Sequence, residues 1–192
     1  MLLKVERVVP SSEAGWGKEE AIMSEPRVAQ PGEGEAYVVL ASELFTAKNR
    51  GERGEGYSMF ENAAQPGYQG TPLHTHRDQK EDLYVLEGHF EFRVDDRTFE
   101  GGPGTFAHFP KGSVHAFRNT AEVDGKVLII FSPAGEGAEG FVEELGEPTQ
   151  EKSPPTLPSE PPDAAMFERV VAVANKHGME IVAPPPEQQQ SY

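Results

Sequence analysis

Between residues 36 and 133 the chain is a series of short runs of β-branched and aromatic residues, each bounded by Gly, Pro, Asn or Asp. This pattern is typical of antiparallel strands joined by tight turns, because such side chains suit a pleated, half-buried surface. Phe90, Phe92 and Val94 alternate with polar residues, as in a strand with one buried face and one wet face. The predicted strands cover residues 37–40, 43–46, 57–60, 83–86, 90–94, 105–109, 115–118 and 127–131. Residues 95–97 are predicted to turn the chain back, and two strand-rich halves that meet near 101–104 predict a closed double-sheet barrel.

The flanking segments have a different composition from the barrel and divide the chain further. We predict an N-terminal arm at 1–34, the barrel at 35–135, a short helix at 136–147, a Pro-rich linker at 148–162, a helix with a short strand at 163–183, and a disordered tail at 184–192. The linker is expected to make no regular ladder, because proline lacks the backbone donor. Asp163 is a good N-cap for the later helix. The apolar stripe of that helix is expected to pack on the barrel or on a second subunit, and it consists of Met166, Phe167, Val170, Val173 and Ala174.

Composition excludes several classes of function. A net charge of −15 repels polyanions, so nucleic acid and anionic membrane surfaces are not expected as partners. The chain has no cysteine, so disulfides, thiolate metal sites and cysteine nucleophiles are excluded, and any metal must be held by nitrogen and oxygen atoms. No stretch approaches the roughly 20 apolar residues that span a bilayer, and the first residues do not resemble a signal peptide. We therefore expect a cytoplasmic protein that acts on a small molecule.

Three histidines and one glutamate have the spacing of a metal site. Residues i and i+2 of a strand point to the same side, so His74 and His76 present both imidazoles to one point inside the barrel. Glu81 follows after a short turn and can bring a carboxylate to the same ion. His115 comes from a later strand, after the tight turn of residues 110–112. Such a set suits one divalent transition metal, Ni, Fe, Mn, Cu or Zn, and leaves about two coordination positions open when the metal is six-coordinate.

The two motifs that contain these residues resemble those of the cupin superfamily. The matching patterns are His74-x-His76-x4-Glu81-x6-Gly88 and Gly104-x5-Pro110-x-Gly112-x2-His115-x3-Asn119. The resemblance implies an all-β cupin fold, a double-stranded β-helix or jelly-roll barrel, here with a C-terminal helical extension. It also favours Glu81 over its neighbours Asp78 and Asp82 as the carboxylate ligand. One position departs from the pattern, because Tyr68 stands where a glycine usually opens the first motif.

More narrowly, the chain is similar to single-domain cupins grouped with quercetin 2,3-dioxygenases. The shared features are residues 72–76, residues 84–88, and a C-terminal 140–146 segment followed by a Pro-rich linker and helix. This resemblance implies a metal-dependent dioxygenase acting on a flavonol-like or other enolisable substrate. Glu81 would accept the hydroxyl proton of the substrate, and ring cleavage would release carbon monoxide.

Two other functions stay open at this point. The same centre could serve a non-catalytic or sensory cupin that binds a small molecule without turnover. It could also serve a metal-dependent isomerase of a sugar or keto acid, with Glu81 moving a proton next to a carbonyl. The residues predicted to line a substrate pocket are Phe60, Phe92, His108, Phe117 and Phe131. Sheet edges and the apolar helix stripe predict a homodimer.

Overall fold

The computed structural model describes residues 28–183 apart from 52, 136 and 161, so the predicted tail at 184–192 and most of the predicted arm at 1–34 lie outside it. The strands are β1 (Ala36–Val39), β2 (Glu43–Asn49), β3 (Ser58–Ala64), β4 (Leu73–His76), β5 (Lys80–Glu87), β6 (Phe90–Val94), β7 (Arg97–Gly101), β8 (Phe106–Phe109), β9 (His115–Asn119), β10 (Gly125–Ser132), β11 (Gly146–Thr149) and β12 (Met179–Ala183). The helices are α1 (Ala138–Leu145) and α2 (Ala164–Lys176). Across the described residues, neither helix combines the length and apolarity needed to cross a membrane.

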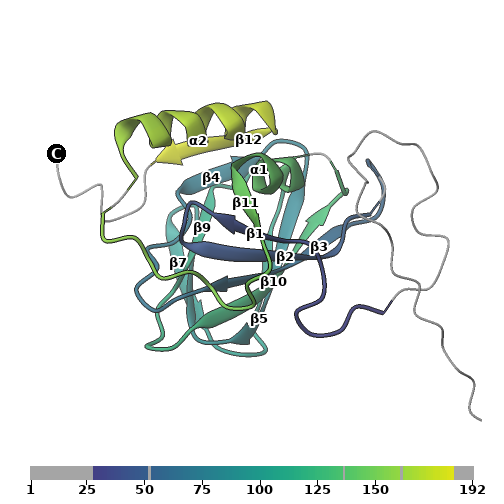
Figure 1. Ribbon diagram of the computed structural model, residues 1–192. Coiled ribbons are helices and arrows are strands. Elements are labelled where there is room, and N and C mark those ends of the chain that lie inside the picture. Colours follow the sequence, from purple (N-terminus) through teal and green to yellow (C-terminus); the bar gives the residue numbers. More distant parts are fainter. Residues whose placement is uncertain (1–27, 52, 136, 161, 184–192) are drawn as a thin grey trace, which may run out of the picture.

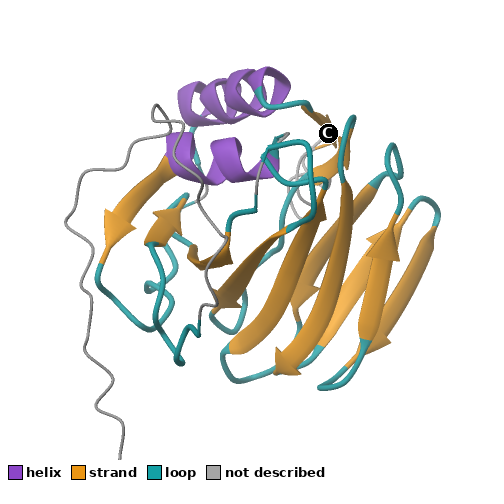
Figure 2. Ribbon diagram, turned by 90° about the vertical axis from the view of Figure 1, so that its right-hand side faces the viewer, coloured by secondary structure: helices purple, strands orange, loops and turns teal. Residues whose placement is uncertain are grey.

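The strands form two antiparallel sheets that face each other, with the helices gathered at one end (Figures 1 and 2). The larger sheet has the order β11-β1-β2-β3-β10-β5-β8, and the smaller has the order β12-β4-β9-β6-β7. The predicted all-β class and the double-stranded β-helix are therefore confirmed. This architecture matters for the site, because β4 and β9 of one sheet face β5 of the other across the interior.

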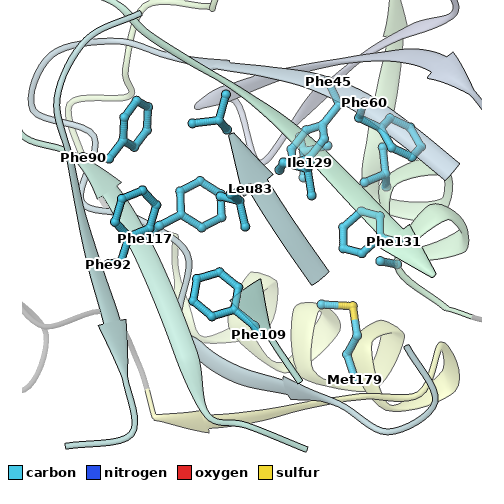
Figure 3. Close-up of a cluster of buried hydrophobic side chains, with 14 of the residues drawn as sticks. Phe45, Phe60, Leu83, Phe90, Phe92, Phe109, Phe117, Ile129, Phe131 and Met179 are labelled. Atoms are coloured by element: carbon cyan, nitrogen blue, oxygen red, sulfur yellow. The ribbon is translucent and has the colours of Figure 1, made fainter. Parts of the chain in front are cut away.

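The interior between the sheets is filled by side chains from alternate strand positions. In β10, buried and half-buried residues alternate along the whole strand, as expected when one face points inward. Figure 3 shows the aromatic rings that fill the interior, together with Met179 from β12. Phe60 and Phe90 are fully buried. The interior is thus a packed apolar medium, in which any polar group is expected to have a partner or a function.

The C-terminal extension packs against the smaller sheet. Asp163 caps α2, as predicted, because its Oδ1 accepts a hydrogen bond from the backbone N of Met166 at 2.8 Å. The buried face of α2 contains Val170, Val173 and Ala174, and the helix lies along β12 (Figure 1). The apolar stripe was expected to pack on the barrel or on a second subunit. In the structure its buried residues pack within the same chain.

The predicted turn at residues 95–97 is confirmed with a shift of one residue, since Asp95 and Asp96 turn the chain and β7 begins at Arg97, which pairs with Val94. The prediction of an irregular linker was wrong at one end. The start of the predicted 148–162 linker belongs to a strand, since Pro148 of β11 lies opposite Tyr37 of β1. Proline is tolerated there because β11 is the edge of its sheet, where a missing donor breaks no second ladder.

Candidate metal centre

Three strands bring the four predicted ligands to one point inside the barrel. His74 and His76 lie two residues apart on β4, and His115 at the start of β9 pairs directly with His74 in the ladder. Glu81 reaches across from β5 of the other sheet. All four side chains are buried, and one candidate ligand atom from each lies within 4.8 Å of those of the others. The convergence predicted from the spacing is therefore present in the fold.

A single carboxylate oxygen lies at the centre of the cluster. Glu81 Oε2 is 2.9 Å from His76 Nε2 and 3.0 Å from His115 Nε2. The Nε2 atom of His74 is slightly farther away, at 3.9 Å. All three imidazoles therefore direct the same nitrogen, Nε2, toward one negative group.

Backbone carbonyls fix the tautomer of two of these imidazoles. His74 Nδ1 lies 2.9 Å from the carbonyl oxygen of Pro72, and His115 Nδ1 lies 3.0 Å from that of Ser113. A carbonyl oxygen only accepts, so each Nδ1 must carry the proton and donate it. The neutral ring then has its lone pair on Nε2, the atom directed at the cluster. Hydrogen bonding of the second ring nitrogen is the usual way in which proteins orient metal-binding histidines.

The pKa values also favour cation binding. Burial, together with the neighbouring His115 and His76, lowers the pKa of His74 to about 3, so the ring is neutral at pH 7. For Glu81, burial alone would raise the pKa, but the close contacts of its Oε2 atom with the imidazoles of His115 and His76 hold it well below its usual range. An ionised carboxylate beside a neutral imidazole is the state in which both bind a metal.

Two phenylalanine rings enclose the cluster. The ring of Phe109 stacks on His115 with 4.3 Å between centroids and 7° between planes. The ring of Phe131 lies 5.6 Å from that of His76. Phe109 pairs with Glu81 in the β5–β8 ladder, which explains why both side chains point inward. An apolar surround of this kind limits water and strengthens charge interactions at the centre.

The donor set fits a divalent transition metal. Three imidazole nitrogens and one carboxylate oxygen suit Zn, Cu, Fe, Ni or Mn, whereas Ca and Mg prefer all-oxygen sites. The charge of Glu81 offsets part of the charge of the cation, and without a cation the carboxylate is a buried charge whose close partners are the imidazoles of His76 and His115. The cluster is therefore a candidate metal centre, and the choice among these metals stays a prediction.

Comparison with known proteins gives the family. The cupin domain family matches residues 62–131, a stretch that contains all four residues of the cluster. This chain belongs to the cupin superfamily. The two cupin motifs lie on the strands and turns that surround the cluster.

Two curated proteins and one solved structure are similar to this cupin. A quercetin 2,3-dioxygenase from Bacillus subtilis (strain 168) is 27% identical over 155 residues, which cover 78% of this chain and 43% of that protein. An uncharacterized protein from Aquifex aeolicus (strain VF5) is 35% identical over 72 residues, or 38% of this chain and 59% of that protein. A cupin sugar phosphate isomerase from Silicibacter pomeroyi DSS-3 is 18% identical, with a TM-score of 0.49, and covers 55% of this chain and 74% of that one. The cupin spans about half the length of the curated relatives it matches.

The residues predicted to line a substrate pocket have different positions. Phe60, Phe92, Phe117 and Phe131 all point into the barrel, and Phe131 contacts a histidine of the cluster. His108 differs from the expectation, because its side chain lies on the outer face of β8 and pairs with Asp82. Strand alternation explains this, since Phe109, the next residue, is the one that faces inward. The four phenylalanines keep their predicted role as a proposal, and His108 is separated from the centre.

Other acidic and amide residues near the motifs have other partners. The Asp82 side chain lies on the outer face of β5, and Asp78 is exposed in the turn before it, so Glu81 is the carboxylate that reaches the histidines. Asn119 satisfies turn backbone, as expected, since its Nδ2 donates to the carbonyl of Val123 at 2.8 Å and its Oδ1 accepts from the backbone N of Ala121 at 3.0 Å.

A second polar cluster inside the cupin barrel was missed by the sequence analysis. Glu43 of β2 accepts a hydrogen bond from Asn62 Nδ2 at 3.1 Å and another from the hydroxyl of Tyr68, the residue that departs from the cupin motif. Burial, with a smaller contribution from the charge of Glu81, raises the pKa of Glu43 to about 7 against the lowering effect of its hydrogen bonds from Tyr68 and Asn62. Strand phase was the available signal, because residues 43, 45 and 47 of one strand share a face, which places Glu43 beside Phe45 and Ala47.

Proposed function

We propose that this cupin is a metal-dependent dioxygenase that acts on a flavonol-like or other enolisable small molecule. The observation that carries the proposal is the buried cluster of three imidazoles around one ionised carboxylate. The similarity to a quercetin 2,3-dioxygenase over most of this chain supports the choice of reaction. Because the match covers less than half of that protein, the activity and substrate are proposals for this chain.

His74, His76, Glu81 and His115 would hold the metal. A bound divalent metal would supply positive charge that favours the ionised form of a chelating substrate and would bring a second reactant next to it. The remaining chemistry depends on the side chains of this chain. The carboxylate of Glu81 can accept a proton, and the neighbouring rings of Phe109 and Phe131 exclude water from it.

Glu81 is the proton acceptor in this proposal. Its carboxylate is ionised, buried and directed at the point where the histidines converge, so it can take a hydroxyl proton from a substrate that reaches this point. Phe109 and Phe131 border the same point and provide flat apolar surfaces for an aromatic ring. We include Phe60, Phe92 and Phe117 as the more distant part of this apolar wall.

Oxygen uptake is the direct test. Protein stripped of metal and reloaded separately with Ni, Fe, Mn, Cu or Zn is incubated with a panel of flavonols and enediols. We expect dioxygen consumption with one or a few metals, coupled to loss of the substrate absorbance and, for flavonols, to carbon monoxide. Glu81→Gln should reduce turnover more than it reduces metal content, since the amide retains an oxygen ligand but is a poor base.

Glu87→Gln is the matched control, because Glu87 lies on the same strand but is exposed and paired with Lys126. It should leave uptake unchanged. Ligand binding with neither uptake nor product would contradict the dioxygenase and favour a sensory cupin. A product formed without uptake would contradict it and favour an isomerase. Equal loss of metal and turnover in Glu81→Gln would contradict the role of Glu81 as base.

A further inference from the structure

We propose that Gln79 and Glu139 are positioning residues of the metal centre, and that they make metal binding depend on the C-terminal extension. Gln79 lies in the turn between two of the candidate ligands, and Glu139 lies on α1, beyond the barrel. The inference rests on the proposed metal centre but not on the choice of dioxygenase chemistry. It is carried by a buried hydrogen-bond network that joins the turn to the helix.

Gln79 is a buried amide in the short turn between β4 and β5. This turn connects His76, the last residue of β4, to Glu81, the second residue of β5. The neighbouring Arg77, Asp78 and Lys80 are exposed, whereas Gln79 is only 1% exposed. Its side chain therefore points into the protein and holds the turn from within.

The amide of Gln79 makes its hydrogen bonds outside the barrel strands. Its Nε2 donates to the carbonyl oxygen of Pro133 at 2.8 Å and to Oε2 of Glu139 at 3.0 Å. Its Oε1 accepts from the backbone N of Ala138 at 2.9 Å. Ala138 is the first residue of α1, and the N-cap position is Gly137, which has no side chain to accept that hydrogen bond. Gln79 thus supplies from the ligand turn the cap that the helix itself lacks.

Glu139 completes the network from the helix side. Its carboxylate, 1% exposed, accepts hydrogen bonds from Gln79 Nε2, from the hydroxyl of Ser58 on β3, and from the backbone N of Gly135 at 2.8 Å. Its position in the first turn of α1 also places its charge near the positive end of the helix dipole. A buried carboxylate with these donors fixes the turn, the helix and the larger sheet relative to one another. Such networks orient functional side chains when every member has a partner.

The extension holds the other side of the same turn as well. β12 pairs with β4, so that Met179 lies opposite His76 and Ile181 lies opposite His74. The backbone N of Arg77 donates to the carbonyl oxygen of Gly178 at 2.8 Å. The strand that carries two histidines is therefore an inner strand of its sheet only because the chain returns after α2.

These contacts predict coupling in both directions. If the extension fixes the ligand turn, then a bound metal must in turn stabilise the extension, because linkage between two equilibria is reciprocal. Metal binding should slow amide hydrogen exchange in α1 and β12, although neither element contributes a ligand. In the metal-free protein, loss of the Gln79 side chain should speed exchange in the turn at residues 77–81.

The test compares Gln79→Ala with Gln69→Ala, a matched change in the loop before β4 at an amide that donates to the nearby carbonyl of Gly67. Dissociation constants for Zn²⁺ and Co²⁺ are measured by chelator competition, and the Co²⁺ absorption spectrum reports the ligand geometry. We expect Gln79→Ala to weaken binding by about 10- to 100-fold, as removal of outer-shell partners typically does. Its Co²⁺ spectrum should also change, and Gln69→Ala should match the wild type in both measurements.

A rescue experiment separates positioning from general stability. Gln79→Glu places two acceptors against each other and should weaken binding, whereas the double variant Q79E/E139Q restores one donor opposite one acceptor and should recover part of the affinity. The single variant Glu139→Gln retains the shape of the network, and it replaces Gln79→Ala in the test if Gln79→Ala does not fold. Lower thermal stability with unchanged affinity, spectrum and turn exchange in these variants would overturn the inference. Metal binding by the wild type without oxygen uptake would instead contradict only the proposed function.

Discussion

The imidazole of His115 lies flat on the ring of Phe109, with 4.3 Å between centroids and 7° between planes. Phe109 is the last residue of β8 and precedes the tight turn that leads to β9, so the ring and the candidate ligand come from the two sides of one connection. The stack fixes the plane of the imidazole, and the hydrogen bond from Nδ1 to Ser113 fixes its rotation. Together they direct Nε2 at Glu81.

Phe109→Leu should therefore affect both stability and metal affinity. An aromatic pair contributes about 0.5–1.5 kcal/mol beyond its buried area, and the smaller side chain leaves unfilled space. We expect the free energy of unfolding to fall by about 1–3 kcal/mol and metal binding to weaken severalfold. Urea denaturation and chelator competition measure the two effects. Phe99→Leu, at a phenylalanine of β7 that is 49% exposed, is the control, and equal effects of both changes would contradict a specific role for the stack.

Glu43 should make the metal-free protein less stable as the pH rises. The pKa of this carboxyl is about 7 in the folded state against 4.5 for an ordinary glutamate, so the folded state holds the proton more strongly. The stability from Glu43 is complete below about pH 4.5 and is lost between about pH 4.5 and 7, by about 3.5 kcal/mol at roughly 1.4 kcal/mol per pKa unit. His74 acts in the opposite direction, since its lowered pKa makes stability fall as the pH drops below 6.5.

The contribution of Glu43 is isolated by comparing wild type with Glu43→Gln at each pH, because His74 is common to both. Urea unfolding between pH 4.5 and 8 in the presence of a chelator should show a gain for Glu43→Gln that grows with pH. Glu87→Gln, an exposed change, should show no such trend. A constant difference across this range would show that Glu43 does not titrate there.

The cap of α2 should contribute to the stability of the extension. Asp163→Ala removes the acceptor for the backbone N of Met166, and loss of an N-cap costs about 1 kcal/mol. Asp163→Asn retains an acceptor and should recover most of this loss. Differential scanning fluorimetry of both variants tests the effect. Equal melting temperatures for the wild type and Asp163→Ala would show that the cap is not needed.

The homodimer stays a prediction, and the structure suggests where to test it. Val170, Val173 and Ala174 of the α2 stripe pack within their own chain and only Met166 of the stripe is exposed, so the sheet surfaces are the better candidate contact. Tyr84 of β5 and Phe106 of β8 are neighbours in the ladder and are 42% and 60% exposed. We expect the wild type to sediment at twice the chain mass of 21.0 kDa. The Phe106→Glu variant should shift toward the mass of a single chain. A single species at the chain mass for the wild type would contradict the dimer.

The sequence predicted the barrel strands and the pairing of His74 with His76 because both follow from short-range rules, whereas the resemblance to the cupin motifs was needed to choose Glu81 and to add His115 from a later strand. Alternation with a period of two places side chains on the inner or outer face, and it places His74 and His76 together. The same rule, applied to residues 106–109, would have placed Phe109 inside and His108 outside. His108 was assigned to the pocket because histidine often lines active sites, although its position in the strand alternation places it on the outer face.

Other features depended on contacts between distant segments. The capping of α1 by Gln79 and the pairing of β12 with β4 join residues that are far apart in the chain, and no local pattern indicates them. Proline is excluded from inner strands but tolerated on an edge strand such as β11, which contains Pro148. This strand was not predicted because an edge position cannot be recognised before the strand order is known. The buried carboxyl of Glu43 was overlooked because a glutamate beside a turn is usually exposed.

A working metal centre requires that His74, His76, Glu81 and His115 bind a single divalent metal ion. The most direct measurement is elemental analysis of the purified protein after dialysis, comparing the wild type with His115→Ala and with His89→Ala, a change at a histidine that is 49% exposed on its side chain and lies outside the cluster. We predict close to one equivalent of a transition metal in the wild type and in His89→Ala, and nearly none in His115→Ala. A wild type that retains no metal after loading, or a His115→Ala variant that retains a full equivalent, would contradict the account.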